Sequence, residues 1–322
     1  MPLHPTLKNM LDAAQAARRP GFAAGTPAQA REMVKSMRAA LGSGPADVAM
    51  QALQVPTRTG PMAAQLYSPA QASAGLVVYL HGGGWVCGAL EDYAVLARTL
   101  AARSGCQVLL LDYRLAPEHP FPAGLEDVQD ALVWASQQLL GGARWRPPLL
   151  VAGDSAGANL GLASVLALRG RIAVALQLYF YPVTDSDLER DSYLHYSEGM
   201  PLTRQDMQWF FGHYAPPSMW ADERISVLRS ADLAGSPRTW IATAEYDVLR
   251  DEGEAYAQRL RAAGVEVELL RAPGLAHGFA RLFNLVDRAD DVIQQAAQAL
   301  ASAAKSHAAT DHPLILNAED LP

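Results

Sequence analysis

A serine between two glycines lies at the centre of the stretch whose residue types could carry out chemistry. The apolar run Leu149 to Ala152 leads into Gly153-Asp154-Ser155-Ala156-Gly157 and then into a helix-forming segment. This order of strand, sharp turn and helix is typical of a nucleophile elbow, in which a strained turn exposes a serine hydroxyl at the top of a sheet. The amides that open the helix would stabilise negative charge developing beside Ser155. The alternative is a glycine-rich turn without chemistry, because Gly-x-Ser-x-Gly alone is a weak motif.

A serine hydroxyl needs a base to take its proton, and the usual base is a histidine held by a carboxylate. Of the eight histidines, His277 follows the last expected strand and would therefore lie at the same edge of the sheet as Ser155. The carboxylate is expected between these two residues in the chain, and Asp247 follows another expected strand. Glu245 is the alternative acid.

Acyl chemistry also needs hydrogen-bond donors for the oxygen that becomes negatively charged. The stretch His81-Gly82-Gly83-Gly84-Trp85 follows an apolar run and can supply them, since glycines leave backbone N–H groups uncovered. Ala156, directly after the serine, offers another amide. We expect His81 to hold this loop by a hydrogen bond rather than to act as the base. The alternative is a glycine run that serves only as a flexible turn.

The elements that must position these residues alternate along the chain. Apolar runs predict strands over residues 76–80, 108–113, 149–152, 175–181, 239–243 and 265–270. Helices are expected over 92–103, 124–140, 252–262 and 290–304, and a hairpin at a sheet edge over 49–67. This alternation predicts an α/β protein with a mostly parallel central sheet and helices on both faces. Ligands bind such a sheet at the carboxyl ends of its strands.

One long segment, residues 184–238, contains no expected strand yet is rich in large apolar side chains. Thr203 and Asp206 predict the start of a helix within it by mutual capping. Together with two amphipathic helices expected within residues 5–42, this insertion is predicted to form a helical cap over Ser155. The alternative is an excursion that only buries apolar surface. The predicted lining of the substrate pocket under the cap is Trp85, Met207, Trp209, Phe210, Phe211 and Tyr214.

These elements divide the 322-residue chain into a core that the cap interrupts. We assign residues 1–45 to the N-terminal cap helices and 184–238 to the cap insertion. The core then comprises residues 46–183 and 239–305. Residues 306–322 form a polar tail to which no role is assigned.

Composition narrows the classes of partner. A formal net charge of −7, without a run of lysine or arginine, argues against nucleic acid or an anionic membrane as the partner, so a neutral or apolar small molecule is the expected substrate. The two cysteines, Cys87 and Cys106, lack the spacing of a metal site or a disulfide framework, and we expect neither a metal nor a cofactor. Because the chain shows no secretion signal and no apolar stretch of membrane-spanning length, we expect a cytoplasmic protein.

Five motifs carry a family resemblance when they are taken together. They are HGGGW at 81–85, YRLAPEHPFPA at 113–123, GDSAGAN at 153–159, EYDVLRDEG at 245–253 and HGF at 277–279. In this combination the chain closely resembles the bacterial hormone-sensitive-lipase-like (family IV) carboxylesterases, in their GDSAG branch, over residues 45–305. The resemblance implies an α/β-hydrolase fold with a helical cap, no cofactor, and hydrolysis of short-to-medium acyl esters.

The resemblance also implies a role for individual residues. Ser155 would be the nucleophile, His277 the base and Asp247 the acid that orients it. The oxyanion hole would be formed by the amides of Gly83, Gly84 and Ala156, with Gly82 as a further candidate. Members of this family often pair through an edge strand, which makes a homodimer compatible with the resemblance. Acyl transfer by the same triad and ligand binding on an esterase fold are the alternatives, and the filled triad positions favour an enzyme.

Overall fold

The computed structural model describes residues 1–71, 74–139 and 147–310, and within them the strands form a single sheet of eight. The strand order is β1-β2-β4-β3-β5-β6-β7-β8. The strands are β1 (Ala49–Thr57), β2 (Gly60–Ser68), β3 (Leu76–Leu80), β4 (Gln107–Leu111), β5 (Leu149–Asp154), β6 (Leu176–Phe180), β7 (Thr239–Tyr246) and β8 (Val267–Ala276). The hairpin β1–β2 is antiparallel and β2 pairs antiparallel with β4, whereas all pairs from β4 to β8 are parallel. The predicted α/β architecture is confirmed.

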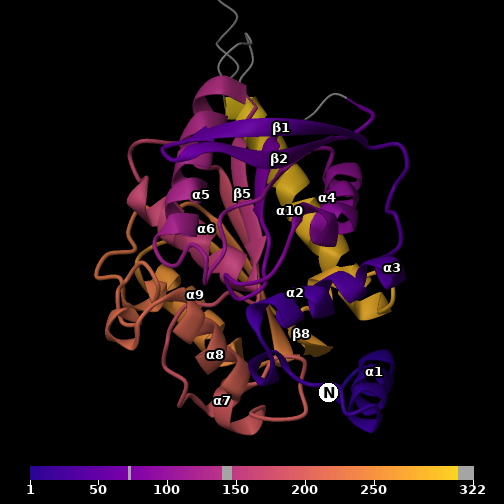
Figure 1. Ribbon diagram of the computed structural model, residues 1–322. Coiled ribbons are helices and arrows are strands. Elements are labelled where there is room, and N and C mark those ends of the chain that lie inside the picture. The colour runs from indigo at the N-terminus through magenta and orange to yellow at the C-terminus, as the bar shows by residue number, and fades with distance from the viewer. Residues whose placement is uncertain (72–73, 140–146, 311–322) are drawn as a thin grey trace, which may run out of the picture.

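Helices cover both faces of this sheet (Figure 1). Helices α5 (Ala123–Trp134), α6 (Ser155–Ala167) and α9 (Arg250–Ala262) lie on one face, and α4 (Leu90–Ser104) and α10 (Asp287–Thr310) lie on the other. Successive residues of β3 alternate between the two cores: Val78 packs with the first set of helices and Val77 with the second. Because side chains of a strand point to opposite faces in turn, a strand buried on both faces reads as a continuous apolar run.

The other α-helices gather at the lower end of the sheet in Figure 1. From the N-terminal segment come α1 (Pro5–Ala16), α2 (Pro27–Ser36) and α3 (Arg38–Leu41), and from the insertion α7 (Asp191–His195) and α8 (Arg204–Tyr214). The short helices are η1 (Phe22–Ala24), η2 (Ala135–Leu139), η3 (Pro217–Met219), η4 (Val227–Arg229) and η5 (Phe279–Arg281). The predicted capping box is present at the start of α8, where the side chains and backbone amides of Thr203 and Asp206 bond reciprocally.

The N-terminal segment and the insertion touch each other directly. Ala23 N donates to Asp206 Oδ1 at 2.9 Å, and the rings of Phe22 and Phe210 lie 5.2 Å apart between centroids. The same carboxylate that caps α8 therefore also binds the backbone of the N-terminal segment. Within the described ranges, none of the helices has the length and hydropathy that crossing a bilayer requires.

β7, β8 and α10 run furthest past the ends expected from the sequence. β7 and β8 run on to Tyr246 and Ala276, because they keep pairing past an irregularity between Ala244 and Tyr246. Pro273 does not end β8, since a strand at the edge of a sheet tolerates proline. Helix α10 continues to Thr310, five residues into the segment assigned to the tail. The rest of that segment, 311–322, lies outside the described residues.

Gly157 allows α6 to approach β3, and its replacement gives the first prediction. A Cβ at this position would lie 2.2 Å from the carbonyl oxygen of Leu80 and 2.3 Å from that of His81. Gly157→Ala must therefore push a helix away from a buried strand, and we expect the free energy of unfolding to fall by about 1–3 kcal/mol in urea denaturation.

Gly212→Ala is the matched control, because Gly212 also lies within a helix but a Cβ there would meet no atom within 4 Å. Its stability should stay the same or rise by up to about 1 kcal/mol. Equal losses in the two variants would contradict the packing argument.

Candidate active site

Ser155 occupies a sharp turn between a strand and a helix. β5 ends at Asp154, α6 begins at Ser155, and Ser155 has the left-handed φ of 54°. A non-glycine residue in this region typically carries about 1–3 kcal/mol of backbone strain and needs surrounding structure to hold it. Gly153 contributes to that hold, because a Cβ there would lie 2.7 Å from the carbonyl oxygen of Leu80. The turn thus has the geometry of the expected elbow.

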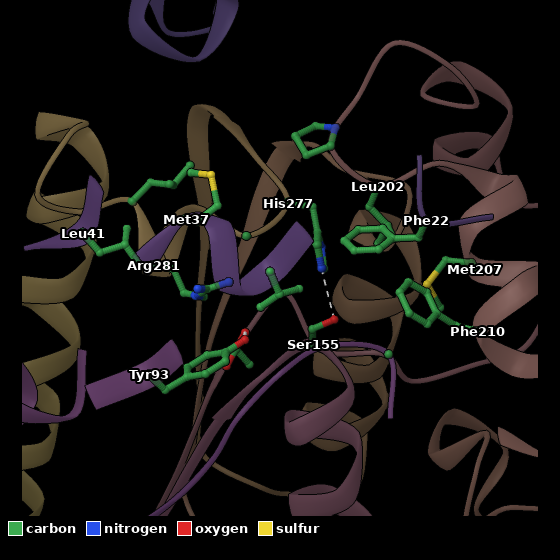
Figure 2. A pocket seen from close by; sticks show the side chains of 17 residues that line it. Phe22, Met37, Leu41, Tyr93, Ser155, Leu202, Met207, Phe210, His277 and Arg281 are labelled. Carbon is green, nitrogen blue, oxygen red and sulfur yellow. Dashed lines mark hydrogen bonds between the residues drawn. The ribbon is translucent and has the colours of Figure 1, made fainter. Parts of the chain in front are cut away.

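The structure brings Ser155, His277 and Asp247 into one hydrogen-bonded chain. Figure 2 shows the bond between Ser155 and His277. Ser155 Oγ lies 3.1 Å from His277 Nε2, and His277 Nδ1 lies 2.8 Å from Asp247 Oδ2. The Asp247 carboxylate is buried, and its other oxygen accepts the amide hydrogen of Leu249 at 3.0 Å. With Nδ1–H donated to Asp247, Nε2 is left to accept the serine proton.

Strand pairing explains how residues 30 positions apart meet. Tyr246 and Ala276 are paired across β7 and β8. Asp247 directly follows Tyr246, and His277 directly follows Ala276. Both strands are parallel to β5, so all three side chains emerge at the carboxyl ends of the strands.

Glu245, the alternative acid, has other partners. Its Oε1 pairs with the amino group of Met1 at 2.8 Å, and its Oε2 accepts the amide hydrogen of Gly274 at 2.6 Å. Its carboxylate thus ties the N-terminal segment to β8, whereas Asp247 is the carboxylate bonded to His277.

The glycine loop after β3 supplies backbone donors beside Ser155. Gly83 and Gly84 line the same cavity as Ser155, with φ of 121° and 61°. In the described part of the chain, the amides of Gly83, Gly84 and Ala156 have no hydrogen-bond acceptor. The amide of Gly82, the further candidate, is committed elsewhere: it donates to Asp154 Oδ1 at 2.9 Å. The geometry therefore favours the first three amides as donors to a ligand at Ser155.

His81 lies inside the protein rather than in the cavity. Its ring is fully buried, stacks on Tyr113 at 4.4 Å between centroids, and places Nδ1 2.8 Å from the carbonyl oxygen of Gly82. Burial lowers the pKa of His81 to about 4, which keeps the ring uncharged at neutral pH. Through the contact with Gly82, His81 is placed to hold the glycine loop, which is the role expected for it from the sequence.

Asp154 is a site residue that the sequence reasoning did not single out. Its carboxyl group is buried beside Ser155 and accepts hydrogen bonds from Gly82 N, Tyr79 Oη at 3.1 Å and Tyr93 Oη at 3.2 Å. Burial raises the pKa of Asp154 to about 6. A charged residue type in an otherwise apolar strand-to-turn sequence was the available signal.

Ser155 opens into a cavity of about 180 Å³. Two of the predicted pocket residues, Met207 and Phe210, line it. The lining residues that the prediction missed come mostly from the N-terminal segment and the loops beside the triad, and include Phe22, Val34, Met37, Leu41, Tyr93, Pro201, Leu202, Arg281 and Leu282. No pattern of spacing marks them in the sequence, because they meet only in the folded chain.

The prediction is corrected for the other four aromatic residues. Trp85 stacks face to face on Tyr214 at 4.3 Å and also contacts Phe211, so these three rings form part of the core under the cavity. Trp209 packs edge-on against His213 at 4.3 Å and is only partly buried. Met207, Phe210, Phe211 and Tyr214 share one face of α8 by the helical period, whereas Trp209 lies on the opposite face. Phe211 and Tyr214 do not line the cavity because that part of the face packs against Trp85.

Among the residues that the structure describes, no group of three or more histidine, cysteine, aspartate or glutamate side chains is placed to hold a metal ion. The site as built pairs an activated hydroxyl with uncovered amide donors, an arrangement suited to acyl transfer chemistry.

Comparisons with known proteins agree with this chemistry. The α/β-hydrolase fold family matches residues 77–281. The ethyl acetate hydrolase of Pseudomonas putida is 35% identical over 316 residues, which cover 93% of this chain and 99% of the relative. The carboxylic ester hydrolase LipN of Mycobacterium tuberculosis is 40% identical over 245 residues, which cover 72% of this chain and 65% of LipN.

Solved esterase structures share the fold over almost the whole chain. A thermostable esterase from Pseudomonas putida ECU1011 superposes with a TM-score of 0.88 at 29% identity, covering 94% of this chain and 97% of that one. The hyperthermophilic esterase of Pyrobaculum calidifontis gives a TM-score of 0.87 at 34% identity, covering 94% and 99%.

The raised pKa of Asp154 predicts a pH-dependent change in stability. The folded protein keeps the Asp154 proton up to about pH 6, whereas an unfolded aspartate loses it near pH 4. Between these values the folded state binds more protons, so the contribution of Asp154 to stability falls as the pH rises. Asp154→Asn lacks this change, and its free energy of unfolding minus that of the wild type should rise by about 2 kcal/mol from pH 4 to pH 7.

Urea denaturation of both proteins across this pH range measures the difference. Asp47→Asn is the control, because Asp47 is exposed and its carboxyl stays in water in both states. For Asp47→Asn, the free energy of unfolding minus that of the wild type should not vary with pH. The same result for Asp154→Asn would refute the burial argument.

Proposed function

The chain belongs to the α/β-hydrolase fold family, among the hormone-sensitive-lipase-like carboxylic ester hydrolases, and on this basis we propose that it cleaves short-to-medium acyl esters through an acyl-enzyme on Ser155. One observation supports the assignment of residues: Ser155 Oγ, the His277 ring and the Asp247 carboxylate form a continuous hydrogen-bonded chain at the floor of a mostly apolar cavity.

The first half of the proposed reaction forms the acyl-enzyme. His277 Nε2 takes the proton of Ser155 as Oγ attacks the ester carbonyl carbon, and Asp247 stabilises the imidazolium that results. The carbonyl oxygen becomes negatively charged and accepts hydrogen bonds from the amides of Gly83, Gly84 and Ala156. The bond to the alcohol oxygen then breaks, His277 gives its proton to that oxygen, and the alcohol leaves.

The second half repeats these roles with water. The water oxygen attacks the acyl carbon while His277 takes a proton from the water, and the same amides bind the oxyanion. The bond to Ser155 Oγ then breaks, and His277 returns the proton to Oγ. Transfer to an alcohol would use the same residues, with the alcohol in place of water. Nothing in the described cavity favours an alcohol acceptor, and hydrolysis is therefore the function proposed.

The cap is part of the proposal. Residues 1–45 and 184–238 would cover the site while 46–183 and 239–305 carry the triad. Support comes from the contacts between Phe22 and Phe210 and between Ala23 and Asp206, which join the two cap segments at the cavity. Covering of this kind excludes bulk water and strengthens the electrostatic interactions at Ser155.

Location and assembly complete the proposal. A cytoplasmic location is supported by Cys87 and Cys106, which are buried, unpaired thiols. A homodimer is supported by β8, which ends the described sheet and leaves one edge for pairing with a second copy.

Removing the serine hydroxyl tests the proposed nucleophile. We expect Ser155→Ala to lower kcat for a p-nitrophenyl butanoate substrate by about 10⁴-fold or more while the protein stays folded. In the wild type, an organophosphate should label Ser155 and no other residue, as read by mass spectrometry of peptides.

Ser164→Ala is the matched control for this test, because Ser164 lies on the same helix and its buried hydroxyl has no hydrogen-bond partner in the described chain. It should keep wild-type activity within a few-fold. Substantial turnover in folded Ser155→Ala would remove the serine mechanism.

The apolar cavity predicts a limit on acyl length. Each methylene that is buried adds about 0.8 kcal/mol of binding until the cavity is full, and further carbons must stay in water. We expect kcat/KM for p-nitrophenyl esters from C2 to C16 to peak at about C4 to C8 and to fall steeply by C12. Met207→Ala should move the peak to longer chains.

Met33→Ala is the control, since Met33 lies on α2 outside this cavity. It should leave the position of the peak unchanged. Activity that climbs through C16, with a jump at the surface of emulsions, would contradict a closed acyl pocket.

A further inference from the structure

One side of the cavity carries a positive charge that the hydrolytic steps do not use. In Figure 2, Phe22, Leu202, Met207 and Phe210 lie on one side of the Ser155–His277 pair, and all are apolar. Met37, Leu41, Tyr93 and Arg281 lie on the other side. Arg281 is the one lysine or arginine among the cavity's lining residues in the described chain.

Arg281 is held in place by two contacts. It ends η5, four residues after His277, and is half-buried. Its Nε donates to the backbone carbonyl of Asp92 at 3.2 Å, and its guanidinium carbon lies 5.0 Å from the ring centroid of Tyr93. These contacts use one donor nitrogen and one face of the guanidinium, and Figure 2 shows the side chain extending from the side of Tyr93 toward the Ser155–His277 pair.

The two terminal nitrogens of Arg281 have no protein partner. Within the described ranges neither Nη1 nor Nη2 has a hydrogen-bond acceptor, and Nη2 is also buried away from solvent. The Asp92 carboxylate is paired with Arg38 Nε at 2.6 Å instead. Unpaired donors in a partly desolvated site are unfavourable, and a ligand oxygen would relieve this.

Asp154 does not serve as the acceptor for the terminal nitrogens of Arg281, although it lines the same cavity. Its oxygens accept hydrogen bonds from Gly82 N and from the hydroxyls of Tyr79 and Tyr93 and none from Arg281, whose positive charge only offsets part of the rise in the pKa of Asp154. The guanidinium of Arg281 thus keeps donors unpaired for an acceptor that comes from outside the chain, and a guanidinium suits carbonyl and carboxylate oxygens.

We propose that Arg281 binds a second oxygen of the substrate, so that the preferred esters carry an oxo or carboxylate oxygen besides the ester group. This inference rests on the function proposed above and names the substrate class of the same site. Arg281 would act on specificity, whereas the bond-breaking steps stay with Ser155 and His277.

The test compares matched esters in the wild type and in Arg281→Met. Ethyl 4-oxopentanoate and monoethyl glutarate are each compared with ethyl pentanoate, and 3-oxobutyl acetate with butyl acetate, in a pH-stat assay. The readout is the ratio of kcat/KM for the oxygenated ester to that for its apolar match. For at least one pair, this ratio should be about tenfold or more higher in the wild type, as expected for loss of a charge-assisted hydrogen bond.

The pairs also distinguish the source of the oxygen. The ketone arms report a neutral acceptor in the acyl or the alcohol half, and the glutarate arm reports a carboxylate. Because intrinsic reactivity is the same for both proteins, it cancels in the comparison. If Arg281 only supports Tyr93 and the charge of Asp154, Arg281→Met will slow every ester in the same proportion, and this result would overturn the proposal.

Arg98→Met is the matched control. Arg98 also lies over a tyrosine, Tyr67, at 5.3 Å and also donates to a backbone carbonyl, that of Val48, but it does not line this cavity. Its ratios should equal those of the wild type. Arg281→Lys, which keeps the charge but not the fork, should lie between the wild type and Arg281→Met.

Binding without turnover separates this inference from the proposed function. By titration calorimetry, at least one of ethyl 4-oxopentanoate, monoethyl glutarate and 3-oxobutyl acetate should bind Ser155→Ala about tenfold tighter than the double variant Ser155→Ala/Arg281→Met. Equal affinities for all three ligands would overturn the role of Arg281 even if all esters are hydrolysed. A wild type that hydrolyses none of the esters would instead overturn the proposed function, while the binding difference would still decide the role of Arg281.

Discussion

The close packing of backbone on backbone beneath Ser155 is the constraint on which the site depends. Ser155 keeps a left-handed φ of 54° only because the turn around it has no freedom to relax. The carbonyl oxygens at the end of β3 fill the space where side chains at Gly153 and Gly157 would stand. The same strand end leads directly into the glycine loop, so the position of the nucleophile and that of the amide donors are set by one contact between β3, β5 and α6.

Asp154 links this backbone contact to the walls of the cavity. Asp154 accepts a hydrogen bond from Gly82 N and so holds the glycine loop. It also accepts one from the hydroxyl of Tyr93, and Arg281 lies over the ring of Tyr93. A buried carboxyl with three donors is a rigid junction, because every donor would lose its partner if the group moved. The nucleophile, the amide donors and the charged side of the cavity therefore share one polar network rather than three separate supports.

The sequence predicted the triad because chemistry and topology together leave few choices. Asp247 and His277 each follow an apolar run, and parallel strands bring such positions to one edge. The walls of the cavity were predicted poorly. Whether an aromatic residue of α8 faces the cavity or the core depends on the rotation of that helix against Trp85, a tertiary contact without a local signal. Phe22 and Met37 were missed for the same reason, since they reach the site only through packing of the N-terminal segment.

The separate origin of the cavity walls affects how such a protein can diverge. Phe22 and Met37 belong to the beginning of the chain, Met207 and Phe210 to the insertion, and Arg281 to the turn after the last strand, whereas Ser155 and its donors belong to the core. Substitutions can thus accumulate in the apolar walls without touching the reacting groups or the polar network around Asp154. Gene duplication followed by drift in the N-terminal segment alone would be enough to yield enzymes with the same catalytic step and different substrate preferences.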